Sequence, residues 1–111
     1  MVSSSPEVLL QDAVIKMNCD IECTAEVLKA IAHPTRLRIL CTLNLSELQV
    51  QTLVERTGSS QSNISQHLAL MKECNILVTR REANRIFYRI RDPQLVQLIQ
   101  LMRDIYCPEA A

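Results

Sequence analysis

The sequence of 111 residues is poor in glycine and in aromatic side chains. It contains one glycine, no tryptophan, one phenylalanine and two tyrosines. A β-rich fold needs many turns, and glycine and proline supply most of them. With one glycine and four prolines, the chain is expected to form helices joined by short turns. Its length predicts one domain over residues 1–111, with loose ends at 1–6 and 108–111.

A long apolar run is also absent. A membrane-crossing helix needs about 20 apolar residues, and no segment of this sequence approaches that length. The start, MVSSSPEVLLQD, has neither the basic residues nor the apolar stretch of a signal peptide. We therefore expect a cytoplasmic protein with no membrane partner. In that reducing compartment, its five cysteines are expected to be metal ligands, redox sensors or core residues rather than structural disulfides.

Net charge is lacking too, because 12 basic and 12 acidic residues balance. The distribution is uneven, however. Residues 56–91 hold seven Arg or Lys against two Glu, a local balance of +5, and residues 1–33 hold two Lys against five Asp or Glu, a balance of −3. A positive block of this kind is the footprint of a surface that binds a polyanion, although a solvated basic surface gives the same pattern.

Apolar residues at helical spacing predict five helices, at about residues 7–31, 35–43, 46–57, 60–74 and 93–106, the first with a break near residues 18–20. Residues 76–81 and 85–90 are rich in branched and aromatic side chains, which predicts a β-hairpin with its turn at 82–84. The fold class is therefore mainly α with a small β-hairpin.

Local signals predict several helix ends. Ser46 with Gln49 three residues later fits a capping box. Gly58 fits the residue just past a helix end, where φ is positive. Ser59 or Ser60 is expected to cap the helix that follows.

Apolar stripes indicate the packed faces of four helices. The members of these stripes are Val27, Leu28 and Ile31; Leu37, Leu40 and Cys41; Ile64, Leu68 and Met71; and Leu95, Leu98, Ile99, Met102, Ile105 and Tyr106. The last stripe is too apolar for a chain end exposed to water, which supports a dimer.

Two short helices that meet at Gly58 form a helix-turn-helix, and the hairpin after them makes it the winged version. In this motif the second helix enters the major groove with its N-terminal residues against the bases. Neutral hydrogen-bonding groups suited to that task are Ser60, Gln61, Ser62, Asn63, Ser65, Gln66 and His67. The hairpin residues expected to contact phosphates or a minor groove are Arg80, Arg81, Asn84 and Arg85. The alternative is a solvated polar helix beside a surface hairpin.

The runs LKAIAHPTRLRILCTL and ELQVQTLVERTGSSQSNISQHLALMKECNILVTRREANRIFYRI resemble the ArsR/SmtB family of bacterial repressors, over about residues 24–107. The resemblance implies a winged helix-turn-helix homodimer that pairs its first and last helices across a two-fold axis. It also implies a palindromic double-stranded operator that is released when an inducer is sensed.

Members of this family that sense metals carry Cys-x-Cys on the third helix, where this chain has Gln49 and Gln51. A carboxamide cannot replace a thiolate for a soft metal. Other members use Asp and His on the last helix, which here has Asp104 but no histidine. Neither metal site is expected, and no cofactor is expected.

Cys41 on the second helix and Cys107 at the end of the last resemble the persulfide-sensing branch of the family, represented by SqrR and BigR. The resemblance implies that a low-molecular-weight persulfide or polysulfide joins these two thiols by a disulfide or polysulfide bridge. Alternatively, Cys41 is a small core residue and Cys107 is incidental.

Other functions remain open from the residues alone. Cys19 and Cys23, four apart on a helix, together with a third thiol would suit a soft metal or arsenite, and a general oxidant sensor would also use the cysteines. Cys74 is expected to be structural. A DNA-binding module without any ligand is a further alternative. No general base is placed near a cysteine and no phosphate loop is present, so an enzyme is not expected.

Overall fold

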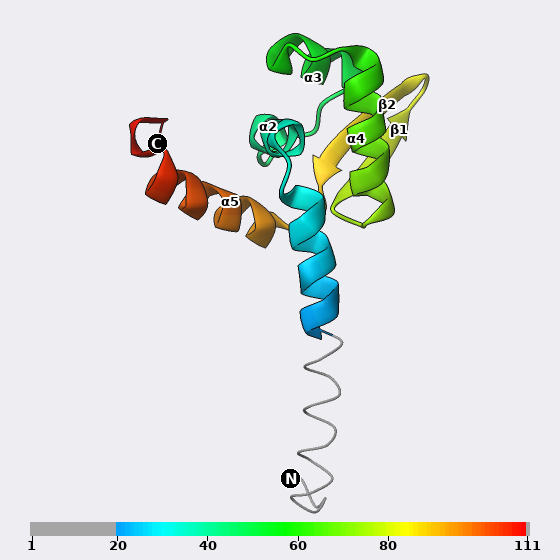
Figure 1. Cartoon of the computed structure of the whole chain (residues 1–111). Coiled ribbons are helices and arrows are strands. Elements are labelled where there is room, and N and C mark those ends of the chain that lie inside the picture. The colour runs from blue at the N-terminus through cyan, green and yellow to red at the C-terminus, as the bar shows by residue number, and fades with distance from the viewer. Residues whose placement is uncertain (1–19, 111) are drawn as a thin grey trace, which may run out of the picture.

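The structure is a computed structural model that describes residues 20–110, and within them the predicted architecture is confirmed (Figure 1). A helix over residues 20–31 comes first. The elements after it are α2 (Pro34–Leu43), α3 (Val50–Thr57), α4 (Gln61–Glu73), β1 (Leu77–Glu82), β2 (Arg85–Ile90), α5 (Pro93–Tyr106) and the short 3-10 helix η1 (Pro108–Ala110). In the described residues these amount to five α-helices and a two-stranded antiparallel hairpin. The predictions for residues 1–19, including the break near 18–20 and Cys19, lie outside the described residues.

The turn between α3 and α4 has the predicted form. Gly58 has a φ of 75°, and its N–H donates to the Val54 carbonyl at 3.0 Å. The Ser60 side chain accepts from the backbone N–H of Asn63 at 3.1 Å. Gly58 therefore ends α3 and Ser60 caps the start of α4, as the sequence predicted.

The predicted capping box at Ser46 is wrong. The Ser46 hydroxyl donates to the Leu43 carbonyl, and Gln49 is the N-cap of α3 without a side-chain hydrogen bond. The reason is a tertiary contact. Leu48 pairs with Tyr88 of β2 through two backbone hydrogen bonds of 2.9 and 2.8 Å, so the chain is extended there and α3 begins only at Val50.

The core lies between α2, α3, α4 and the base of the hairpin. Ile64, Leu68 and Met71 are fully buried, as their spacing predicts. Two predicted core positions are wrong in the single chain, because Leu37 is 38% exposed and Leu28 is 50% exposed. The core face of α2 consists instead of Ile39, Leu40 and Leu43.

The hairpin projects from this core with a buried base and an exposed tip. Its register runs from Leu77 opposite Ile90, which are both buried, to Glu82 opposite Arg85, which are both exposed. The turn is shorter than predicted, since Glu82 pairs within the ladder and only residues 83–84 form the turn. The tip is therefore free to reach a partner.

Helix α5 extends away from the core (Figure 1), and Ile99 is its one buried residue. Several of its other apolar side chains are exposed in the single chain: Leu98, Leu101, Met102, Ile105 and Tyr106. No helix among residues 20–110 is long and apolar enough to cross a membrane.

Candidate nucleic-acid interface and thiol site

Helix α4 presents a polar face to solvent along its first two turns. Ile64 and Leu68 are fully buried and fix the rotation of the helix. The candidate side chains that this rotation leaves exposed are Ser60, Gln61, Ser62, Ser65 and Gln66. Asn63 and His67 are half-buried. A helix held by its apolar stripe with amide and hydroxyl groups outward can hydrogen-bond to base edges.

His67 is less free than its neighbours because its ring packs on His33. The two ring centroids are 4.5 Å apart, at an interplanar angle of 44°. His33 is also the N-cap of α2, where its Nδ1 accepts from the Thr35 N–H at 3.1 Å. Burial, together with the charges of His33 and Arg36, lowers the pKa of His67. Helix α4 and the N-cap of α2 therefore meet at two imidazole rings, a contact that the sequence did not predict.

The hairpin arginines differ in their surroundings. Arg81 and Arg85 are exposed, as is Asn84 in the turn. Arg80 instead donates to Glu47 Oε1 and to Glu82 Oε2, each at 2.7 Å. Because the carboxylates of Glu47 and Glu82 already pair with its guanidinium, Arg80 is less available to DNA than Arg81 or Arg85.

The Arg80 guanidinium also lies 4.6 Å from the centre of the Phe87 ring. The hydrogen bonds that Arg80 donates to the two carboxylates raise the pKa of Arg80, and the bonds to Glu47 lower the pKa of that carboxyl group. This network joins β1 to the segment before α3. It thereby fixes the position of the β1–β2 hairpin, which is the wing of the motif. The contact of Arg80 with DNA stays a prediction.

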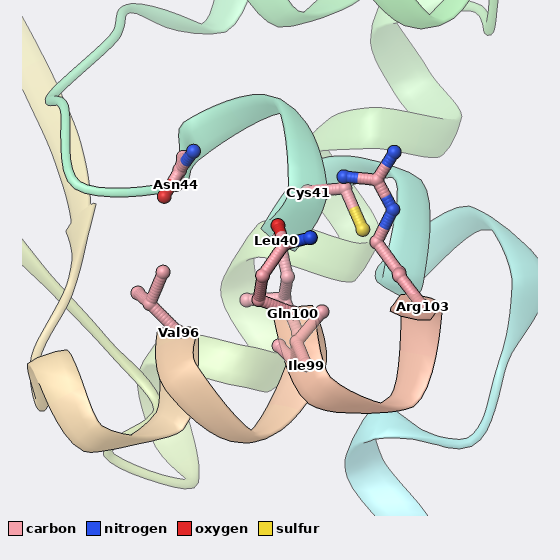
Figure 2. A pocket seen from close by; sticks show the side chains of 7 residues that line it. All are labelled: Leu40, Cys41, Asn44, Val96, Ile99, Gln100 and Arg103. Carbon is pink, nitrogen blue, oxygen red and sulfur yellow. The ribbon is translucent and has the colours of Figure 1, made fainter. Parts of the chain in front are cut away.

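Cys41 lies at the junction of α2 and α5 (Figure 2). It lines a small pocket whose walls are Leu40, Cys41, Asn44, Val96, Ile99, Gln100 and Arg103. The side chain is half-buried and packs against the core. Arg103 from α5 lines the same pocket, and Figure 2 shows its guanidinium beside the Cys41 side chain, so a positive charge faces the thiol.

Cys107 is the C-cap of α5, and its side chain is exposed. Its backbone N–H donates to the Arg103 carbonyl at 2.7 Å, which places it one helical turn after the residue beside Cys41. Cys41 of α2 thus shares a pocket with one turn of α5, and Cys107 ends the next turn of that helix. Both are free thiols.

The other cysteines of the described residues, Cys23 and Cys74, are free and exposed. Within residues 20–110, no group of three or more His, Cys, Asp or Glu side chains is arranged to hold a metal ion. Gln49 caps α3 and Gln51 is exposed on it.

A packed helix-turn-helix with a polar second helix, followed by a basic hairpin, defines the class of winged helix-turn-helix DNA-binding regulators. The family described as "Bacterial regulatory protein, arsR family" matches residues 33–78. The biofilm growth-associated repressor of Xylella fastidiosa (strain Temecula1) is 36% identical over 85 residues, covering 77% of this chain and 75% of that protein. The chain belongs to the ArsR family.

Other similarities agree. The transcriptional activator HlyU of Vibrio cholerae is 41% identical over 81 residues, covering 73% of this chain and 75% of that protein. The crystal structure of the repressor BigR from Xylella fastidiosa has a TM-score of 0.74 at 35% identity, covering 83% and 94% of the two chains. A homodimeric winged helix-turn-helix domain from Mycobacterium bovis has a TM-score of 0.71 at 27% identity, covering 96% and 90%. The chain is a transcriptional regulator with a DNA-binding fold and not an enzyme.

Proposed function

We propose that the protein is a homodimeric repressor that leaves its palindromic operator when a low-molecular-weight persulfide or polysulfide bridges Cys41 and Cys107. The proposed response to persulfide rests on the position of Cys41. This side chain is half-buried against the turn of α5 that directly precedes Cys107. The proposal includes a cytoplasmic location without a membrane partner, and one domain over residues 1–111.

DNA is read by α4 and by the wing in this proposal. The exposed amides and hydroxyls of α4 face the bases, and the exposed Arg81 and Arg85 contact the backbone or a minor groove. A good side-chain pair with a base contributes about 1–3 kcal/mol of discrimination. Two such helices in a dimer read two half-sites one helical turn apart, which is why the operator is expected to be palindromic.

Dimerisation uses the apolar side chains that the single chain leaves exposed. Met102, Ile105 and Tyr106 on α5 and Ile21 and Leu28 on the first helix belong to this set. Burial of such a patch against a second copy is favourable at about 25 cal/mol per Å² of apolar surface. The homodimeric neighbour from Mycobacterium bovis supports a homodimer.

The sensing reaction starts at Cys41. Its thiolate attacks the sulfane sulfur of a persulfide, forms a Cys41 persulfide and releases the thiol of the donor. The Cys107 thiolate then attacks the inner sulfur of the Cys41 persulfide, which forms the disulfide and expels hydrosulfide. The two cysteines lose two electrons to the persulfide. If the Cys41 persulfide instead gains another sulfur before capture, the bridge is a polysulfide.

A bridge would act on DNA binding through α2. Cys41 lies between Leu40 and Thr42, and Leu40 and Leu43 are fully buried in the core beneath α4. A covalent link from α2 to the end of α5 would change the angle between the dimer helix and the recognition helix. The two α4 helices would then no longer match their half-sites.

The test uses a duplex that the reduced protein selects from a random library. Fluorescence anisotropy is measured before and after treatment with glutathione persulfide. We expect about tenfold or more weaker binding for the wild-type chain. Cys41→Ser and Cys107→Ser should bind the duplex like the wild type and show no response. Parallel samples with hydrogen peroxide and with arsenite, scored by whether a Cys41–Cys107 bridge forms in the peptide masses, separate persulfide sensing from general oxidant or metalloid sensing at this site. Full DNA affinity after a complete Cys41–Cys107 bridge would overturn the proposal.

A further inference from the structure

A second pair of cysteines lines one open cavity at the opposite end of α4. Cys23, on the helix over residues 20–31, and Cys74, at the end of α4, line the same open cavity. The C-terminal end of α4 lies beside that helix in Figure 1. Both thiols are free and exposed, so a small reagent reaches either one.

The backbone directs both side chains to this place. Cys23 is four residues before Val27, which packs against the core, so the two project from the same face of the helix. Cys74 is the C-cap of α4, and its N–H donates to the Leu70 carbonyl at 3.1 Å. Asn75, with a φ of 61°, then turns the chain into β1. Cys74 is therefore at the joint between the recognition helix and the wing.

The basic side chain that lines the cavity has a partner other than the two thiols. Lys29, the cation of the cavity wall, pairs with Glu26 at 3.5 Å, and Glu22 and Asn75 complete the polar lining. The two sulfurs come from segments about 50 residues apart in sequence, which makes their sharing of one cavity a property of the fold.

We propose that Cys23 and Cys74 form a second dithiol site, separate from Cys41 and Cys107, that hydrogen peroxide closes into an intrachain disulfide. One thiolate attacks the peroxide, becomes a sulfenic acid and releases water after proton transfer. The other thiol attacks the sulfenic sulfur and expels a second water. One peroxide is thereby reduced to two water molecules while the thiol pair loses two electrons and two protons.

The bridge fixes the end of α4 and the start of the wing to the first helix. The base-reading residues are at the other end of the same rigid helix, so a displacement at Cys74 changes how they meet the groove. A coupling of this kind weakens DNA binding by about fivefold or more. Peroxide would thus act on α4 directly through Cys74, whereas persulfide would act through Cys41 on α2 and Cys107 at the end of α5.

The experiment uses the full chain with Cys19→Ser, Cys41→Ser and Cys107→Ser, which keeps only Cys23 and Cys74. One equivalent of peroxide should remove two hydrogens from the intact mass, add no oxygen and protect both thiols from alkylation. Trypsin should release residues 17–29 joined to residues 73–80. Affinity for the selected duplex should fall about fivefold or more and recover with dithiothreitol.

The matched control adds Cys74→Ser, which should leave a sulfenic acid on Cys23, no cross-link and an unchanged affinity. The wild-type chain treated with peroxide should give the same 17–29 to 73–80 cross-link, which keeps the test valid if the variant folds poorly. A disulfide between protomers on a non-reducing gel, the absence of this cross-link, or a cross-link with unchanged affinity would overturn the proposal. None of these results depends on Cys41 or Cys107.

Discussion

Arg80 on β1 and Glu47 before α3 are joined by hydrogen bonds from the guanidinium Nη2 at 2.7 Å and Nε at 3.0 Å to the same carboxylate oxygen. The two residues are 33 positions apart in the sequence. This ion pair holds the wing against the helix-turn-helix, and it also neutralises one arginine of the basic hairpin. The wing therefore has arginines of two kinds: one that positions it, and others that are free for DNA.

Substitution of both Glu47 and Glu82 by Gln should release Arg80 and steepen the salt dependence of DNA binding, because one more cation becomes available to a phosphate. Arg81→Gln should have the opposite effect and lower the slope by about one counterion. The measurement is the affinity for the selected duplex between low and moderate salt. A slope equal to that of the wild type for the carboxylate variant would show that Arg80 is not held away from DNA by its ion pairs.

Gln66→Ala should act on specificity rather than on salt dependence. Gln66 is exposed on the polar face of α4, and the loss of one base contact is expected to cost about 1–3 kcal/mol on the selected duplex. Binding to a duplex of unrelated sequence should not change. A parallel loss on both duplexes would argue against a base contact.

Ser60→Ala should destabilise the protein by about 1 kcal/mol, since the N–H of Asn63 loses its acceptor at the start of α4. Ser59→Ala is the matched control, because the bond formed by Ser59 is donated by its backbone N–H to Thr57 and does not use its hydroxyl. Urea unfolding of the two variants measures the difference. Similar midpoints for both would contradict the assignment of Ser60 as the cap.

The pH dependence of stability should carry the signature of His67. Its pKa in the folded chain is lowered, mainly by burial, so the unfolded chain binds a proton more readily. The stability associated with the neutral ring is complete above the unfolded pKa of about 6.5. It decreases as the pH falls toward the lowered pKa of the folded state. Urea unfolding from pH 8 to pH 5 should show this decrease in the wild type and a smaller one in His67→Gln.

The sequence predicts well where local rules decide the structure. The stripe of Ile64, Leu68 and Met71, the positive φ of Gly58 and the cap at Ser60 each depend on residues within one or two helical turns. These local rules also place the candidate DNA-reading face, because a buried stripe fixes the opposite face of the same helix.

Contacts between distant segments were not predictable in the same way. The pairing of Leu48 with Tyr88 delays the start of α3, and no local signal at Ser46 reveals it. The packing of His33 on His67 likewise needs the placement of α4 beside the start of α2 to be known in space. Helical spacing placed Leu28 and Leu37 in apolar stripes, but spacing alone does not say whether a stripe faces the core of its own chain.

The proposed response to persulfide is tested most directly on an immobilised operator. The reduced protein is bound to the selected duplex, glutathione persulfide is added, and released and retained protein are digested separately. The released fraction should contain the tryptic peptides 39–56 and 104–111 joined through Cys41 and Cys107, and the retained fraction should contain both peptides with free thiols. The same fraction of bridged peptide in both samples would contradict the account.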